Sequence, residues 1–279
     1  MLALAISLAS AASWGVSDFL GGLQSRRLSV LAVLAVSQPA GLLLIGVLIL
    51  LFGADPVSAD KLAIAFLAGA ASLGGLGAFY AAMAMGTVSV VAPIASLGVV
   101  VPVVFGVAQG EDPGTIQLAG LIVAIAGVVI LSYEEHPEHG GVARRSIVLA
   151  ILAGLGFGVF FTGIDVASPD RPGWAILAVR VGGVSAVAVA ILIRRPPMDG
   201  VPRAIPVLVA IGMFDIIANA LFAVASTKGI LPVVAVGGSM YPAFTIALAH
   251  LVLGERLATI QWGGVALALV GVGLIAGGS

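Results

Sequence analysis

The sequence of 279 residues is far more apolar than a water-soluble domain, because 61% of its residues are hydrophobic and only 9% are charged, against roughly 25% charged residues in soluble domains. The net charge is −1, no basic tract indicates a nucleic-acid partner, and the absence of cysteine excludes disulfides and thiolate metal sites. Apolar runs of about 20 residues follow one another, which is the length that crosses a hydrocarbon core about 30 Å thick. The composition therefore predicts an all-α integral membrane protein.

Ten apolar segments are expected to form transmembrane helices. The first apolar run continues from Leu2 to Gly22, beyond signal-peptide length, so we expect it to be retained as a span. Turns rich in proline and glycine separate the segments, and the longest polar stretch covers residues 133–145. In chain order, the expected helices are residues 2–20, 30–52, 62–83, 89–108, 115–132, 146–165, 174–193, 204–227, 232–253 and 258–275.

One pattern occurs twice in the chain. Residues 86–127 and 229–271 each contain an apolar segment with internal proline, serine and glycine, then a Gly-Glu turn, then a second apolar segment that opens with Thr-Ile-Gln. Equivalent positions of the two copies differ in number by a constant amount, which we call the repeat offset. One inserted residue before the Gly-Glu turn raises this offset by one. Equivalent pairs are Trp14 and Phe157, Val90 and Val233, and Gly110 and Gly254. The chain therefore contains two copies of one unit.

The two copies are expected to cross the membrane in opposite directions. Each copy contributes five spans, and an odd number of spans makes the second copy enter from the opposite face. We therefore predict ten transmembrane helices in two inverted five-helix repeats, with the first repeat at residues 1–135, a polar linker at 136–145 and the second repeat at 146–279. This architecture allows two half-bundles to exchange conformations around one central site.

The distribution of basic residues predicts the orientation. Loops on one side of the ten-helix topology carry eight Lys and Arg residues, and loops on the other side carry three. The side with the excess should be cytoplasmic, which places both termini outside. The eight are Arg26, Arg27, Arg144, Arg145, Arg194, Arg195, Arg203 and Arg256, and the three are Lys61, Arg171 and Lys228.

Short motifs mark the first, fourth and last two expected helices. They are Trp14-Gly15, a glycine-to-Ala-Pro stretch at residues 86–93, and Gly-Glu-Arg at 254–256 followed by Gln261-Trp262. In these motifs and in its two five-helix units, the chain resembles the EamA family of the drug/metabolite transporter superfamily. The resemblance implies transport of amino acids, other metabolites or drugs, mostly outward. It also implies cytoplasmic termini, which is opposite to the orientation that the basic residues predict.

Polar side chains inside the expected spans are candidates for a functional site. An ionised group at the bilayer centre costs about 2.5 to 3.5 kcal/mol on insertion scales. Asp215 lies near the middle of the eighth span, and its i+4 and i+7 neighbours, Asn219 and Phe222, share its helix face. This face binds a substrate amine or a proton in one interpretation. In the other, Asp215 forms a structural interhelical pair, with Arg180 as the candidate partner.

Arg180 lies two turns into the seventh span. Three interpretations are open for this residue. It binds a substrate carboxylate bidentately, it neutralises Asp215, or it extends its head group to the membrane surface. The EamA resemblance implies an arginine in both the second and the seventh helix. In this chain the equivalent position in the second helix is Ser37, so any such contribution comes from one half only.

Asp18 lies about one turn before the end of the first expected span, close to Arg26 and Arg27. It is interpreted as one member of a gate ion pair or as a proton-coupling carboxylate. The alternative is an acidic residue at the membrane interface near basic residues. Trp14 precedes it by four residues on the same helix face. This tryptophan either walls a cavity or packs against lipid and neighbouring helices.

Prolines interrupt the fourth and ninth expected helices, where each removes a backbone hydrogen bond and kinks the helix. The freed carbonyls either line a cavity or are satisfied by neighbouring groups. The predicted substrate-binding residues are Asp215, Asn219, Arg180, Trp14, Tyr80, Tyr241, Phe157, Ser96 and Ser239, and the predicted proton-coupling or gate residues are Asp18 and Asp215.

These features together predict a secondary active transporter that exports small metabolites or drugs by alternating access, with a cavity walled by the first, third, fourth, sixth, eighth and ninth expected helices. The alternative is a structural or lipid-interacting membrane protein without transport activity. An intramembrane enzyme is disfavoured, because His136, His139 and His250 do not form a metal set. We expect no metal and no cofactor, and as partners a small-molecule substrate and the lipid of the cell membrane, with a homodimer left open.

Overall fold

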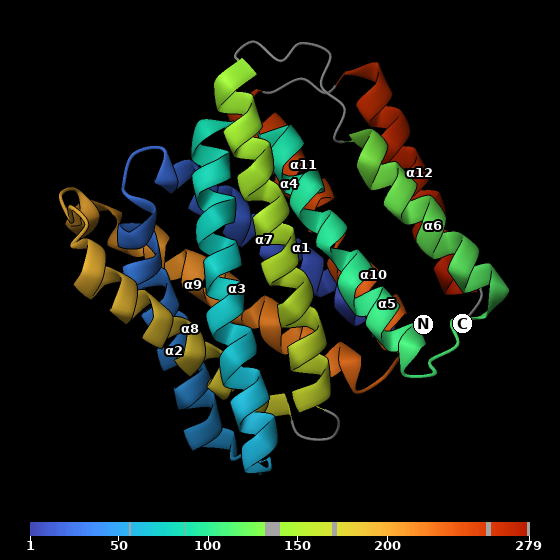
Figure 1. Ribbon diagram of the computed structural model, residues 1–279, viewed down its shortest axis with the longest axis horizontal. Coiled ribbons are helices and arrows are strands. Elements are labelled where there is room, and N and C mark those ends of the chain that lie inside the picture. The colour runs from blue at the N-terminus through green and yellow to red at the C-terminus, as the bar shows by residue number, and fades with distance from the viewer. Residues whose placement is uncertain (56, 87, 132–139, 169–171, 255–257, 278–279) are drawn as a thin grey trace.

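The computed structural model describes residues 1–55, 57–86, 88–131, 140–168, 172–254 and 258–277, and these ranges contain helices and no strand (Figure 1). The first half of the chain forms α1 (Leu2–Ser25), α2 (Val30–Phe52), α3 (Ala59–Met85), α4 (Val88–Ser96), the 3-10 helix η1 (Leu97–Val99), α5 (Val100–Ala108) and α6 (Gly114–Leu131). The second half forms α7 (Gly140–Ala167), α8 (Pro172–Arg194), α9 (Val201–Ser226), α10 (Leu231–Gly238), α11 (Tyr241–Leu253) and α12 (Thr259–Gly277).

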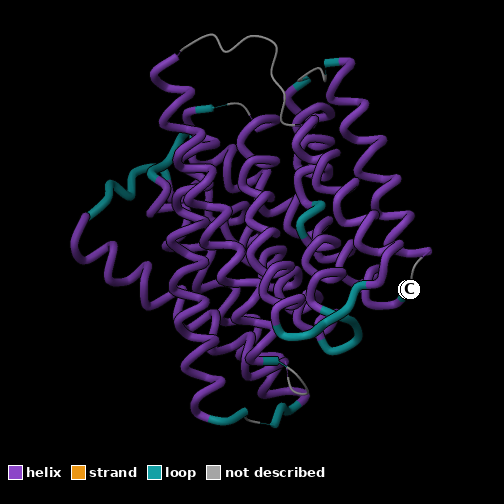
Figure 2. The backbone as a smooth tube through the Cα atoms, turned by 45° about the vertical axis from the view of Figure 1, so that its right-hand side comes forward, coloured by secondary structure: helices purple, strands orange, loops and turns teal. Residues whose placement is uncertain are grey.

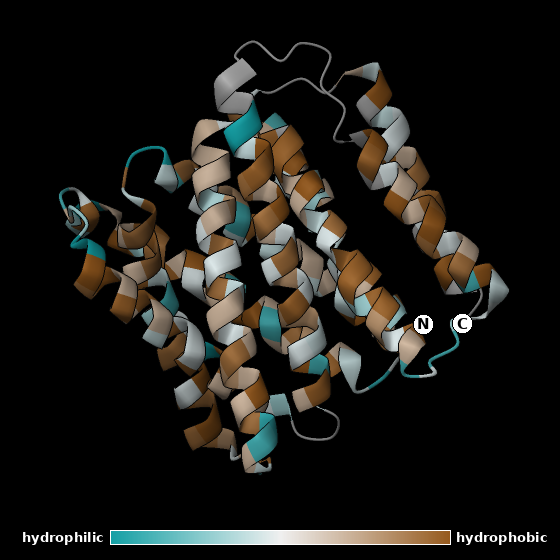
Figure 3. Ribbon diagram, in the orientation of Figure 1, coloured by the Kyte–Doolittle hydropathy of each residue, from teal (hydrophilic) through white to brown (hydrophobic). Residues whose placement is uncertain are grey.

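Every expected helix is present in the described residues. Eight segments are long and apolar enough to cross a membrane, and α6 and α12 add the shorter apolar stretches Gly114–Gly127 and Trp262–Ile275. Large apolar side chains face outward, such as Leu50, which is 86% exposed, and Leu251, which is 77% exposed. Figure 3 shows this hydrophobic colour over most of the helical surface. The fold is therefore that of a multi-pass membrane protein.

The boundaries differ from the expected ones at two kinds of place. Helix α7 begins at Gly140, before the expected start at Ser146, so the described end of the predicted linker is helical. The fourth and ninth expected helices are each broken into two pieces, at η1 and at residues 239–240. Pro102 and Pro242 lie just after these breaks, and proline lacks the N–H that would continue the ladder. The two breaks fall at nearly equivalent places in the repeat.

The two halves pack against each other in equivalent ways. Helix α1 packs against α9, and the equivalent pair of α7 and α3 is also in contact. The same exchange relates the pair α2 and α9 to the pair α8 and α3. Helices α6 and α12 pack on each other at one edge of the bundle (Figure 1). Figure 2 shows an almost entirely helical chain in which loops mainly join helix ends.

Individual side chains repeat this relation. The rings of Trp14 and Phe222 lie 5.7 Å apart, and those of the equivalent residues, Phe157 and Phe79, lie 5.6 Å apart. Close backbone approach repeats as well. An added Cβ on α1 at Gly15 would meet Tyr241 and Phe244, and one on α7 at Gly158 would meet the equivalent residues, Gly98 and Val101.

The Gly-Glu turn of the repeat has a conformational reason. Gly110 and Gly254 have φ angles of +91° and +70°, a left-handed conformation that glycine adopts without a Cβ clash. After the first turn, Glu111 accepts a hydrogen bond of 3.1 Å from the backbone N–H of Leu231, the first residue of α10. Glu111 therefore caps a helix start in the other half of the molecule. Glu255 lies outside the described residues.

Equivalent turns lie at opposite ends of α8. At its start, the Trp174 indole N–H donates to the carbonyl oxygen of Ala54, 2.9 Å away. Beyond its end, the hydroxyl of Ser29 donates to the carbonyl oxygen of Pro197, 3.4 Å away. Ala54 and Pro197 are related by the repeat offset. The 23 residues of α8 separate them by about 35 Å along its axis.

Candidate functional site

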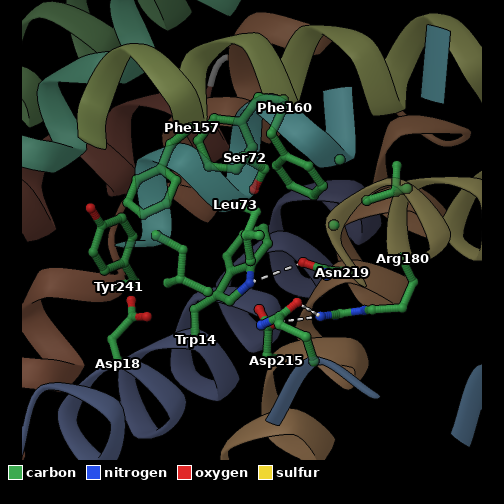
Figure 4. A pocket seen from close by; sticks show the side chains of 16 residues that line it. Trp14, Asp18, Ser72, Leu73, Phe157, Phe160, Arg180, Asp215, Asn219 and Tyr241 are labelled. Atoms are coloured by element: carbon green, nitrogen blue, oxygen red, sulfur yellow. Dashed lines mark hydrogen bonds and ion pairs between the residues drawn. The ribbon is translucent and has the colours of Figure 1, made fainter. Parts of the chain in front are cut away.

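A cavity lies in the centre of the helical bundle, between the two halves (Figure 4). Its empty space is about 580 Å³, including the part that opens to solvent, which is within the range of small-molecule sites. The lining residues are Trp14, Asp18, Gln38, Gly69, Ser72, Leu73, Leu76, Phe157, Phe160, Phe161, Val179, Arg180, Gly183, Asp215, Asn219 and Tyr241.

A buried ion pair spans one side of the cavity. The guanidinium Nη1 of Arg180 in α8 lies 2.7 Å from Oδ2 of Asp215 in α9. The same nitrogen donates to the amide oxygen of Gln38 in α2 at 2.5 Å. Arg180 is 2% exposed, so the pair neutralises two charges that would be costly to bury alone. This is the structural pair that the sequence left as one interpretation of Asp215.

Trp14 and Asn219 form a second polar contact across the halves. The indole N–H of Trp14 in α1 donates to Oδ1 of Asn219 in α9 at 3.1 Å. Trp14 also packs against Phe160 and Phe161 of α7, with ring centroids 6.0 Å and 5.5 Å away. The tryptophan is therefore a cavity wall that is fixed at both its polar and its apolar side, rather than a lipid-facing residue.

Asp18 is one turn further along the same face of α1 and also lines the cavity. It is 5% exposed and therefore buried. In the described part of the chain its carboxylate has no hydrogen bond and no ion pair, and Arg26 and Arg27, which lie beyond the end of α1, are exposed. The predicted proximity to these arginines assumed a shorter helix; α1 continues to Ser25, so Asp18 lies two turns inside it.

Pairs of equivalent residues line the cavity from opposite sides. The members of each pair are related by the repeat offset. One pair is aromatic, one is polar on both sides, and in the other two a polar residue corresponds to an apolar one. The pairs are Trp14 with Phe157, Asp18 with Phe161, Ser72 with Asp215, and Leu76 with Asn219. The cavity is therefore positioned by the repeat, whereas in the two pairs that carry a charge only one member is charged.

Most of the predicted site residues meet at this cavity. Asp18, Asp215, Asn219, Arg180, Trp14, Phe157 and Tyr241 line it. Tyr80 is fully buried beside the cavity without lining it. The hydroxyls of Ser96 and Ser239 donate to the carbonyl oxygens of Pro93 and Val236, both at 2.8 Å. These two serines satisfy backbone groups at the helix breaks and do not reach the cavity.

The sequence did not predict several lining residues. Gln38 precedes Pro39 in α2, and its neighbour Ser37 is the equivalent of Arg180. Phe160 and Phe161 were missed, and the available signal was the repeat offset, which relates Asp18 to Phe161. The walls also differ: α2 and α8 contribute, whereas α4 and α5 do not. At the position equivalent to Tyr241 the first half has Gly98, which has no side chain to reach the cavity.

Metal chemistry has no support in the described residues, because no group of three His, Asp or Glu side chains there could hold an ion. His136 and His139 lie outside those residues.

A bundle of membrane-spanning helices around a buried cavity with a few charged side chains is the architecture of membrane transport proteins. The model of the EamA-like transporter family matches residues 1–133 and 144–277. The chain therefore belongs to the EamA-like transporter family, as the motif resemblance predicted. A solved structure described as "Crystal structure of protein" is similar over 98% of both chains, with a TM-score of 0.77 and 15% sequence identity, which shows a shared fold. No curated protein matches the chain.

Proposed function

We propose that this protein is a secondary active transporter that exports small organic molecules, such as amino acids, related metabolites or drugs, across the cell membrane by alternating access. The observation that carries the proposal is the cavity between the halves, because equivalent residues line it from both sides. Transporters with inverted repeats bind their substrates near the middle of the membrane, at the interface of the repeats.

The topology in this proposal is ten spans in two inverted repeats, at residues 1–135 and 146–279, joined by a linker. The opposite positions of Ala54 and Pro197 along α8 support the inversion. The equivalent contacts between halves support a two-fold relation. Two similar half-bundles in such an arrangement can form two cavity states of similar energy, which alternating access needs.

The mechanism assigns polar and apolar tasks to different residues. Arg180, Asp215 and Asn219 anchor polar groups of the substrate, and Trp14 and Phe157 hold its apolar part. One half-bundle then rocks against the other. Close helix contacts without intervening side chains, such as that between Gly98 and Gly154, let helices slide with little obstruction.

Transport in sealed vesicles tests the proposal. A panel of amino acids, related metabolites and drugs is screened by thermal shift on the purified protein, and the stabilising compounds are offered to proteoliposomes. We expect flux above that of empty liposomes, and loss of flux with Asp215→Asn or Arg180→Ala while membrane insertion is unchanged. Normal flux with both variants would reject the site. Absence of flux for every stabilising compound would favour the lipid-interacting alternative.

The coupling ion is tested in the same vesicles. We propose a proton as the coupling ion, with Asp18 or Asp215 as its carrier, because both carboxylates line the cavity. Flux is compared with and without an imposed pH gradient. Flux that ignores the gradient would leave transport intact and remove proton coupling.

A further inference from the structure

The charges of the cavity do not balance. Its charged lining residues, among those that the structure describes, are Asp18, Arg180 and Asp215. Arg180 and Asp215 compensate each other at 2.7 Å. Asp18 remains, so the cavity carries one uncompensated carboxylate.

No part of the described chain compensates this carboxylate. Asp18 is 5% exposed, and a buried charge is costly unless a partner or ligand neutralises it. Arg26 lies two turns further along the chain, about 12 Å along the helix direction, and is exposed to solvent. A bound cation or a proton from outside the described residues therefore neutralises this group.

Aromatic residues line the same cavity as the uncompensated carboxylate. In Figure 4 the Asp18 carboxylate points toward Tyr241. The Tyr241 ring packs edge to face on Phe157, with centroids 6.2 Å apart and an interplanar angle of 89°. Trp14 lies one turn before Asp18 on the same helix face. The faces of such rings attract cations, and tryptophan does so most strongly.

We propose that the cavity binds a monovalent organic cation, whose ammonium group pairs with Asp18 and whose apolar body packs against Trp14, Phe157 and Tyr241. The inference rests on the proposed function, since it assigns the substrate class of the same cavity. An anion would be repelled by an ionised Asp18 in the same cavity. A zwitterion would have to place its carboxylate at Nε or Nη2 of Arg180, because Asp215 and Gln38 already occupy Nη1.

Matched probes of one shape test the assignment on the purified full-length protein. The probes are 2-phenylethylammonium, the neutral 2-phenylethanol and the anionic 3-phenylpropionate, and calorimetry measures their dissociation constants. We expect the ammonium probe to bind at least tenfold more tightly than the alcohol, and the carboxylate probe to bind most weakly, because the three differ mainly in the charge presented to Asp18.

Substitutions then test whether Asp18 is the ligand. Asp18→Asn should weaken the ammonium probe at least tenfold, to the level of the alcohol, whereas Asp18→Glu should keep the preference for the cation. Asp60→Asn is the matched control, because Asp60 is exposed in the first turn of α3 and does not line the cavity. It should leave all three dissociation constants unchanged.

Several results would overturn the inference. These are equal binding of the ammonium and alcohol probes, tighter binding of the carboxylate probe, no binding of the ammonium probe, or an unchanged cation preference in Asp18→Asn. The wild-type probe series decides alone if Asp18→Asn does not fold. The proposed function is judged separately by flux of the screened panel, so a carrier with another substrate class would show flux without cation preference.

Discussion

At the residue scale, the Arg180–Asp215 pair and the Trp14–Asn219 bond differ in how far the sequence indicates them. Asp215 and Arg180 are both rare charges in apolar segments, so a pair between them was one of the predicted alternatives. The bond from Trp14 to Asn219 had no such signal, because an amide and an indole carry no charge that demands a partner. The charge rule therefore identified Asp215 and Arg180, whereas only the packing of α1 on α9 brings Trp14 to Asn219.

The ion pair leads to a prediction about stability. Arg180→Met leaves Asp215 without its partner, and Asp215→Leu leaves Arg180 with a single remaining bond to Gln38. Each single variant should lower the free energy of unfolding by about 3 to 5 kcal/mol, whereas the double variant should lose less than either. Unfolding in mixed detergent micelles measures this double-mutant cycle.

The control for this cycle is Arg194→Met, at the exposed end of α8. A change within about 0.5 kcal/mol is expected there, as for surface substitutions away from special features. Strictly additive losses in the double variant would mean that Arg180 and Asp215 stabilise the fold independently, and the interpretation of the pair as mutually neutralising would be wrong.

At the element scale, glycines of one helix have different tasks. An added Cβ at Gly69 in α3 would overlap the backbone of Val179 in α8, whereas one at Gly74 in the same helix would meet nothing within 4 Å. Gly69→Ala should therefore destabilise the protein by about 1 to 3 kcal/mol. Gly74→Ala should be neutral or stabilise by up to about 1 kcal/mol, because alanine favours the helix.

Thermal unfolding of the two variants beside the wild type checks this prediction. Similar behaviour of both would mean that α3 and α8 can separate to admit a methyl group. The sequence indicates close helix contacts only in general, because small residues allow close approach wherever they lie. It did not distinguish Gly69 from Gly74, since the point at which two helices cross depends on the angle between them and not on the local sequence.

At the scale of the whole molecule, the repeat was the strongest sequence signal. The repeat offset predicted the order of helices, the interruptions near Pro102 and Pro242, and the equivalence of Trp14 and Phe157. The same offset did not predict the site chemistry, because Asp18 corresponds to Phe161 and Arg180 to Ser37. A repeat fixes which helices meet at the centre, whereas one-sided substitutions decide what they bind.

Inversion of the two halves relative to the membrane is the last prediction. The chain has no cysteine, so an introduced thiol is the only one to react. Ala54→Cys and Met198→Cys place a thiol in exposed equivalent turns, between α2 and α3 and between α8 and α9. A membrane-impermeant maleimide should label Met198→Cys only from the cytoplasmic side, beside Arg194 and Arg195, and Ala54→Cys only from outside.

Solubilisation in detergent is the control, since both thiols should then react. Labelling of both turns from one side of the membrane would contradict the inverted repeat and, with it, the rocking of two half-bundles. The reverse pattern, with Ala54→Cys labelled from the cytoplasm, would keep the inversion and place both termini in the cytoplasm. In that case the excess of eight basic residues over three in the loops would not determine the orientation, and the orientation implied by the EamA resemblance would hold.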